Sequence, residues 1–120
     1  AGIGSSLNVL RLEHNSIGNQ ALSTLVEALQ TCTGIEKLYL SGNDFSSAAA
    51  GLGSLSDWLL SDEVNLHELK LSYCRMNDEG LHELFQGVAN CKELDLEGNE
   101  SITSTGLSYL SNAIRSDSCR

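Results

Sequence analysis

The side chains best suited to chemistry in this 120-residue sequence are four cysteines and three histidines. Closely spaced thiolates and imidazoles bind zinc, and a cysteine beside a histidine can act as a nucleophile. The sequence has no C-x-x-C pair, and His14, His67 and His82 lack the spacing of metal ligands. No serine, histidine and aspartate set or carboxylate pair is expected to converge where strands end. We therefore expect no metal site, no cofactor and no enzymatic activity.

A second kind of chemistry is recognition by exposed polar and aromatic side chains. Tyr39 and Tyr73 are the expected anchors, because exposed tyrosines recur as binding hot spots. The remaining candidates are charged or polar residues at equivalent places in four similar segments. The complete candidate set for partner binding is Arg11, Glu13, His14, Lys37, Tyr39, Lys70, Tyr73, Glu93, Asp95 and Glu97. Mixed charge also keeps an exposed strand face soluble, so each of these residues is either a contact or simply solvated.

The charge balance excludes several kinds of partner. Seven basic and 16 acidic residues give a formal net charge of −9, which would repel a phosphate backbone or an anionic membrane.

No apolar run approaches the roughly 20 residues that span a bilayer, and the first residues lack the basic segment of a secretory signal. The four cysteines are even in number, but a disulfide framework is usually denser and belongs to small domains without a sufficient core, which favours reduced thiols. We expect a cytoplasmic protein with a protein partner.

Four copies of one frame position these candidates. The frame L-x-x-L-x-L-x-x-N-x-I/L/F/M appears as LNVLRLEHNSI, IEKLYLSGNDF, LHELKLSYCRM and CKELDLEGNESI, which start at residues 7, 35, 66 and 91. The spacings of 28, 31 and 25 residues fall within the range of leucine-rich repeats. The sequence therefore predicts a single domain, 1–120, with repeats at 7–34, 35–65, 66–90 and 91–120.

Each repeat is predicted to hold one strand and one helix. The L-x-L pairs have the period of two of a strand with one buried side: Leu10/Leu12, Leu38/Leu40, Leu69/Leu71 and Leu94/Leu96. The stripes that follow have helical spacing: Leu22, Leu25, Val26 and Leu29; Leu52, Leu55 and Leu59; Leu81, Leu84, Phe85 and Val88; Leu107, Leu110 and Ile114. The helices are expected to begin after N-caps at Gly18, Ser46, Asn77 and Thr103. Trp58 lies beside the second stripe and is read as a packing residue.

The mean spacing of 28 residues and the junctions in NDEGLHEL and TSTGLSYL resemble the ribonuclease-inhibitor-like subfamily of leucine-rich repeats. The resemblance covers nearly the whole chain. It implies an α/β solenoid of right-handed βα repeats, with a parallel sheet on the concave face and helices on the convex face.

One frame position carries a cysteine where the other three carry asparagine. The predicted structural ladder at this position is Asn15, Asn43, Cys74 and Asn99. The chain must turn inside the solenoid after each strand, and an Asn amide can pair the backbone groups of that turn. Cys74 would fill the same small buried slot, and a buried Asn99 would make its glycosylation sequon inactive.

The resemblance implies a protein-recognition module, since roles of the family include ribonuclease inhibition, sensing in immune receptors and capping of actin filaments. One alternative is a GTPase-activating type of enzyme regulator, similar to the Ran GTPase-activating protein, with Arg75 as its rim arginine. Another is a purely architectural segment of a longer array. Neither end carries a polar cap, so we expect a piece of a longer chain or end-to-end self-association.

Overall fold

The computed structural model describes residues 7–32 and 34–108. Strands and helices alternate along this part of the chain. The strands are β1 (Val9–Arg11), β2 (Lys37–Tyr39), β3 (Glu68–Lys70) and β4 (Glu93–Asp95). The helices are α2 (Asn19–Leu29), α3 (Ala49–Leu59) and α4 (Asp78–Val88), and residues 104–108 begin a further helical turn. The predicted α/β repeat fold is thereby confirmed.

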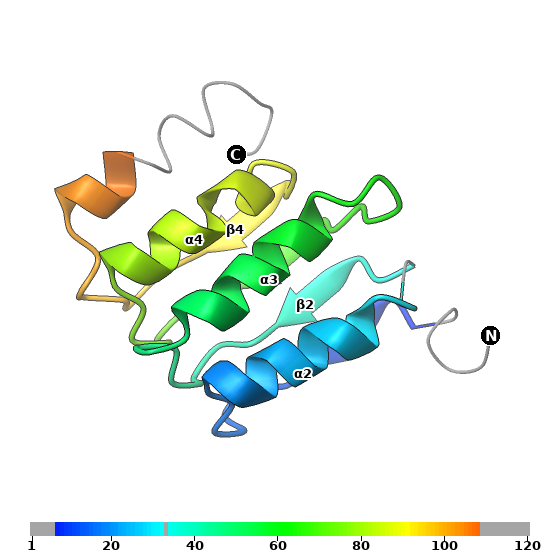
Figure 1. Cartoon of the computed structure of the whole chain (residues 1–120), viewed down its shortest axis with the longest axis horizontal. Coiled ribbons are helices and arrows are strands. Elements are labelled where there is room, and N and C mark those ends of the chain that lie inside the picture. Colours follow the sequence, from blue (N-terminus) through cyan, green and yellow to red (C-terminus); the bar gives the residue numbers. More distant parts are fainter. Residues whose placement is uncertain (1–6, 33, 109–120) are drawn as a thin grey trace.

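The four strands form one parallel sheet in the order β1-β2-β3-β4. The pairing register aligns equivalent frame positions, so that Leu10, Leu38, Leu69 and Leu94 stand in one row. Helices α2, α3 and α4 lie side by side in a layer in front of the sheet (Figure 1). The sheet side turned away from the helices is called the concave face below. Residues at the same frame position in successive repeats form a column across this face.

The core lies between the sheet and the helices. The inner pairs Leu38/Leu40 and Leu69/Leu71 are fully buried. The outer pairs Leu10/Leu12 and Leu94/Leu96 are only partly buried, because among the described residues β1 and β4 each pair with a single strand. The predicted stripe residues of α2, α3 and α4 are buried, except Leu25 and Phe85, which are half-buried.

Leu107 departs from its predicted stripe because 51% of its surface is exposed. Gly106, and not Leu107, is buried against Asp78 and Ile102 at this turn. Leu110 and Ile114 lie outside the described residues.

Three predicted helix starts agree with the structure and one is wrong. Gly18 and Asn77 are the N-caps of α2 and α4, and Asn77 Oδ1 accepts from the Gly80 amide at 3.0 Å. The carbonyl of Thr103 accepts from the Leu107 amide in the last described turn. Ser46 does not cap α3, whose N-cap is Ala48. Asp44 Oδ1 accepts from both the amide and the hydroxyl of Ser46, which forms a turn that delays the helix by two residues.

Polar side chains join neighbouring helices on the convex side. The Trp58 indole is 3% exposed and donates its Nε1–H to the Leu29 carbonyl at 3.0 Å, which confirms the packing role expected for it. The Ser56 hydroxyl accepts from the Gly87 amide at 2.8 Å. A Cβ on Gly87 would lie 2.7 Å from the Ser56 backbone, so this glycine allows α3 and α4 to approach closely.

The asparagine ladder is the main polar structure of the interior. Asn43 is 2% exposed, and its Oδ1 accepts from the amides of Asn15 and Ile17, both at 2.9 Å. Its Nδ2 donates to the carbonyls of Leu12 and Leu40 at 3.0 and 2.8 Å. One side chain thus satisfies four backbone groups in two adjacent turns.

Asn99 makes the same set of bonds between the turns that follow β3 and β4. Its Oδ1 accepts from the amides of Cys74 and Met76, and its Nδ2 donates to the carbonyls of Leu71 and Leu96. The four distances lie between 2.8 and 3.0 Å. The amide of Asn99 is therefore committed to the interior.

Cys74 and Asn15 occupy the other two ladder positions differently. The Cys74 thiol is fully buried and donates to the Leu40 carbonyl at 3.2 Å, and burial raises its pKa. Asn15 is exposed, and its Nδ2 donates to the Glu13 carbonyl of its own turn. The prediction of a buried ladder amide is wrong for Asn15, because its repeat has no earlier described turn beside it.

This difference makes Asn43 and Asn15 a matched pair for mutation. Asn43→Leu should cost about 3 kcal/mol or more, because four backbone groups lose their partner and each buried unpaired group costs roughly 1–3 kcal/mol. Asn15→Leu should cost less than about 1 kcal/mol, and Cys74→Ala should fall between the two. Urea denaturation measures all three. Equal losses at Asn15 and Asn43 would contradict the assignment of the ladder.

Candidate functional site

The concave face carries the residues predicted to bind a partner. Arg11, Lys37, Glu93 and Glu97 are exposed there, and Glu13, Lys70 and Asp95 are half-buried. His14 and Tyr73 follow their strands and lie on the rim, where Tyr73 is 61% exposed. The structure thus brings the candidate set onto one continuous surface formed by the four strands and their following turns.

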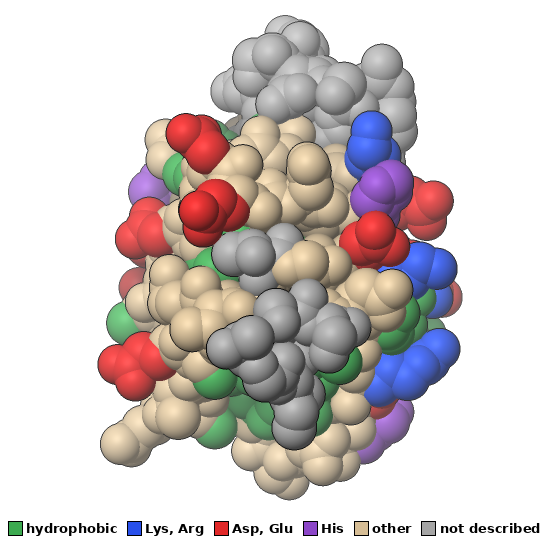
Figure 2. Space-filling view, turned by 90° about the vertical axis from the view of Figure 1, so that its right-hand side faces the viewer, with side chains coloured by type: hydrophobic (Ala, Val, Ile, Leu, Met, Phe, Trp, Pro, Cys, Tyr) green, Lys and Arg blue, Asp and Glu red, His purple; other side chains and the backbone are tan. Residues whose placement is uncertain are grey.

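Charge is distributed unevenly between the two sides of the molecule. Helices α2, α3 and α4 contain no Lys or Arg, whereas β1, β2 and β3 each carry one. Figure 2 shows the Lys and Arg side chains gathered along one edge, which is the strand side, with carboxylates on both sides. Three of the five Lys and Arg residues in the described part of the chain, Arg11, Lys37 and Lys70, therefore lie on the concave face.

Tyr39 is not the exposed anchor that the sequence predicted. Its side chain lies at the centre of the concave face but only 6% of the residue is exposed. Arg11 covers the ring from β1, with its guanidinium carbon 4.6 Å from the ring centroid, and Lys70 covers it from β3, with Nζ at 5.1 Å. Long side chains on adjacent strands reach the ring because strands are only about 4.8 Å apart. The Tyr39 ring therefore holds the Arg11 and Lys70 side chains at the centre of the concave face.

A hydrogen bond fixes the other end of Tyr39. The phenol donates to Glu68 Oε1 at 2.7 Å, and Lys70 Nζ lies 3.6 Å from the second oxygen of the same carboxylate. The bond to Glu68, followed by burial, raises the pKa of Tyr39. The same bond lowers the pKa of Glu68, with smaller help from the charges of Lys70 and Lys37. Glu68 was not in the predicted set, although it occupies the same frame position as the predicted residues Lys37 and Glu93.

These shifts give a titration prediction. Glu68→Gln should lower the pKa of Tyr39 toward its ordinary value of 10.0, because the carboxylate disfavours the tyrosinate. Glu13→Gln should have a smaller effect, since Glu13 is the smallest of the named causes. Ultraviolet absorbance of tyrosinate follows the titration. An unchanged Tyr39 titration in Glu68→Gln would contradict the assigned bond.

The bond also contributes to stability within a defined pH range. Its contribution is fully present between the ordinary pKa values of 4.5 for Glu68 and 10.0 for Tyr39. It is lost as pH falls through the lowered pKa of Glu68 or rises through the raised pKa of Tyr39.

The rim alternates between two kinds of turn. After β2 and β4 a glycine with a positive φ of 80°, Gly42 or Gly98, precedes the ladder asparagine. After β1 and β3 the residues on both sides of the ladder position have φ near 57°: His14, Ser16, Tyr73 and Arg75. The ring of the second kind of turn covers the glycine of the first kind. A Cβ on Gly42 would lie 2.2 Å from His14, and one on Gly98 would lie 2.3 Å from Tyr73.

Gly98→Ala should therefore be destabilising by more than about 1 kcal/mol, because alanine is strained at positive φ and its methyl group collides with the Tyr73 ring. Adding Tyr73→Ala should recover only the part due to the collision. The control is Gly53→Ala in α3, where the nearest atom is the flexible end of Glu83 and helix propensity favours alanine by roughly 0.5–1 kcal/mol. Thermal unfolding of the variants separates these cases.

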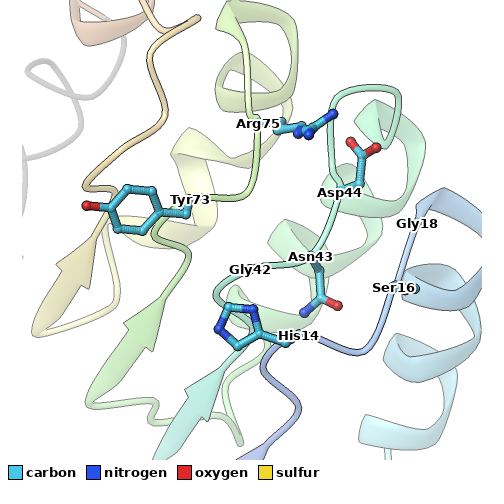
Figure 3. Close-up of a pocket in the computed structure, with 8 residues that line it drawn as sticks. All are labelled: His14, Ser16, Gly18, Gly42, Asn43, Asp44, Tyr73 and Arg75. Atoms are coloured by element: carbon cyan, nitrogen blue, oxygen red, sulfur yellow. The ribbon is translucent and has the colours of Figure 1, made fainter.

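A hollow of about 670 Å³ lies on the rim between the turns after β1, β2 and β3. In Figure 3 the His14 ring lies beside Gly42 and Asn43, the Arg75 guanidinium points toward Asp44, and the Tyr73 ring points away from the hollow. Asp44 has a lowered pKa, chiefly because of its bonds to Ser46 and to a small extent because of the charge of Arg75. Sequence reasoning named Arg75 but missed Asp44, which no repeat column singles out.

Two features of the described residues bear on other functions. Residues 7–32 and 34–108 hold no group of three or more His, Cys, Asp or Glu side chains able to bind a metal ion. Within the same part of the chain, none of the helices has the length and apolar character required to cross a membrane. Cys32 and Cys74 are free thiols, and neither is among the residues that line the hollow.

The geometry defines a protein of stacked strand–helix repeats with a polar concave face. Residues 64–85 and 92–111 match a family model described as Leucine Rich repeat, and these segments include β3 and β4. The match and the geometry together support a leucine-rich repeat protein. Such repeats serve in general as scaffolds for protein interaction and are typically not enzymes.

Proposed function

We propose that this chain binds a protein partner on its concave face and the adjoining rim, as a scaffold of the ribonuclease-inhibitor-like kind. The observation that carries the proposal is the organised centre of the concave face, where Arg11, Tyr39, Lys70 and Glu68 hold one another in place. Side chains that are ordered before binding lose less conformational entropy when a partner arrives.

The shape of the surface also supports this proposal. The strand rows are in register, so contacts recur at regular intervals over a rigid surface suited to an extended interface. The rim adds Tyr73, a large ring that is exposed and is positioned against Gly98. An exposed tyrosine on a fixed backbone offers contact area at low entropic cost.

Selection of a random peptide display library against the 120-residue chain tests the proposal. Bound peptides should shift the backbone amide resonances of β2, β3 and their following turns, and leave those of the exposed helix positions unchanged. Lys37→Trp should weaken binding at least about tenfold, since an indole at this exposed strand position occupies the contact surface. Thr24→Trp on the exposed side of α2 is the matched control and should change affinity less than about twofold.

Selected peptides that bind only the helices would overturn the proposal. A chain for which no peptide is selected, and which gains stability only within a longer array of repeats, would favour the purely architectural alternative.

A further inference from the structure

Two like charges flank one aromatic ring at the centre of the concave face. Arg11 and Lys70 come from strands on either side of β2, and both contact the ring of Tyr39. The negative face of an aromatic ring attracts each cation and limits its conformations. The ring therefore holds two basic groups in a small area of an acidic protein.

The carboxylates that pair with these cations are less accessible than the cations themselves. The Arg11 side chain is 67% exposed and its partner Glu13 is 30% exposed, with 3.2 Å between the charged groups. The Lys70 side chain is 42% exposed and its partner Glu68 is 19% exposed. Glu68 is further held by the Tyr39 hydroxyl. A partner approaching this point meets the basic groups first.

Strand β4 presents the opposite charge on the same face. Its column residues are Glu93, Asp95 and, just after the strand, Glu97, and the strand contains no basic residue. Asp95 stands beside Lys70 in the register, and Glu93 stands beside Glu68. The concave face thus changes from basic to acidic between the Tyr39 ring and β4.

We infer that the partner segment crosses the strands with an acidic side chain on Arg11 and Lys70 and a basic side chain against the carboxylates of β4. This inference rests on the proposed function and adds the charge pattern of the partner. The ring on β2 and the acidic column on β4 are two strand spacings apart, roughly 10 Å. The two charged side chains of the partner must be separated by a similar distance.

Proline-rich peptides provide a ruler for this distance. Residues i and i+3 of a polyproline II helix lie on the same side and roughly 9.3 Å apart. The test peptide is Ac-Pro-Pro-Glu-Pro-Pro-Lys-Pro-Pro-NH2, and the controls carry two Glu or two Lys in the same places. Binding to the full chain is measured by amide chemical shifts at low ionic strength, where surface electrostatics are strongest.

The mixed peptide should bind at least about fivefold more tightly than either control, and moderate salt should remove the difference. Arg11→Gln combined with Lys70→Gln should abolish the preference. Lys92→Gln is the matched control, because Lys92 is exposed before β4, outside the contacts with Tyr39, and its loss should leave the preference intact. Circular dichroism and the unfolding midpoint establish that each variant is folded.

Two outcomes separate this inference from the function on which it rests. Equal binding of the three ruler peptides to a chain whose library-selected peptides still occupy the concave face would overturn the inference and leave the proposed function standing. Failure of every selected peptide to reach the concave face would overturn both.

Discussion

The fold depends on pairing the backbone groups that enter the interior where each strand ends. A chain that turns inside a packed structure must bury amides and carbonyls, and unpaired buried groups cost free energy. Asn43 and Asn99 solve this with one acceptor and two donors each, so two side chains satisfy eight backbone groups. Because each amide joins two consecutive repeats, it also fixes the register in which the concave columns stand.

The alternation of turns explains why cysteine and asparagine share a frame position. An Asn preceded by a positive-φ glycine reaches back into the previous turn, whose own ladder residue need not supply a second amide. At the intervening junction the Phe45 amide donates to the Cys74 carbonyl at 2.8 Å, so the backbone makes the bond there. A small thiol then suffices in the buried slot. The sequence shows this alternation as Gly before Asn43 and Asn99, and a ring before Asn15 and Cys74.

The frame predicted the fold because its signals are local and repeated. Two periods, one for strands and one for helices, placed every leucine row correctly in β2 and β3, and Asn43 and Asn99 were assigned to the interior. Ser46 was assigned wrongly because Asp44 forms a competing turn, and Asn15 because its burial depends on a neighbouring turn. Burial of Tyr39 depends on which long side chains lie beside it on β1 and β3. The frame gives that adjacency, but the conformations of those side chains arise from three strands together.

A columnar surface changes how binding residues are recognised. On this sheet the exposure of a residue depends on the side chains at the same frame position in the neighbouring strands. Residue type alone therefore gave the wrong exposure for Tyr39, whereas Tyr73, on a turn beside Gly98, is exposed as predicted. Covering an aromatic ring with two cations transfers recognition from the ring to the cations, and the ring then serves to hold them. The carboxylates beneath prevent the cluster from being a bare excess of positive charge, which would be costly to assemble. In the binding mode proposed above, charge order along the strand rows carries the specificity that a single exposed tyrosine would otherwise have supplied.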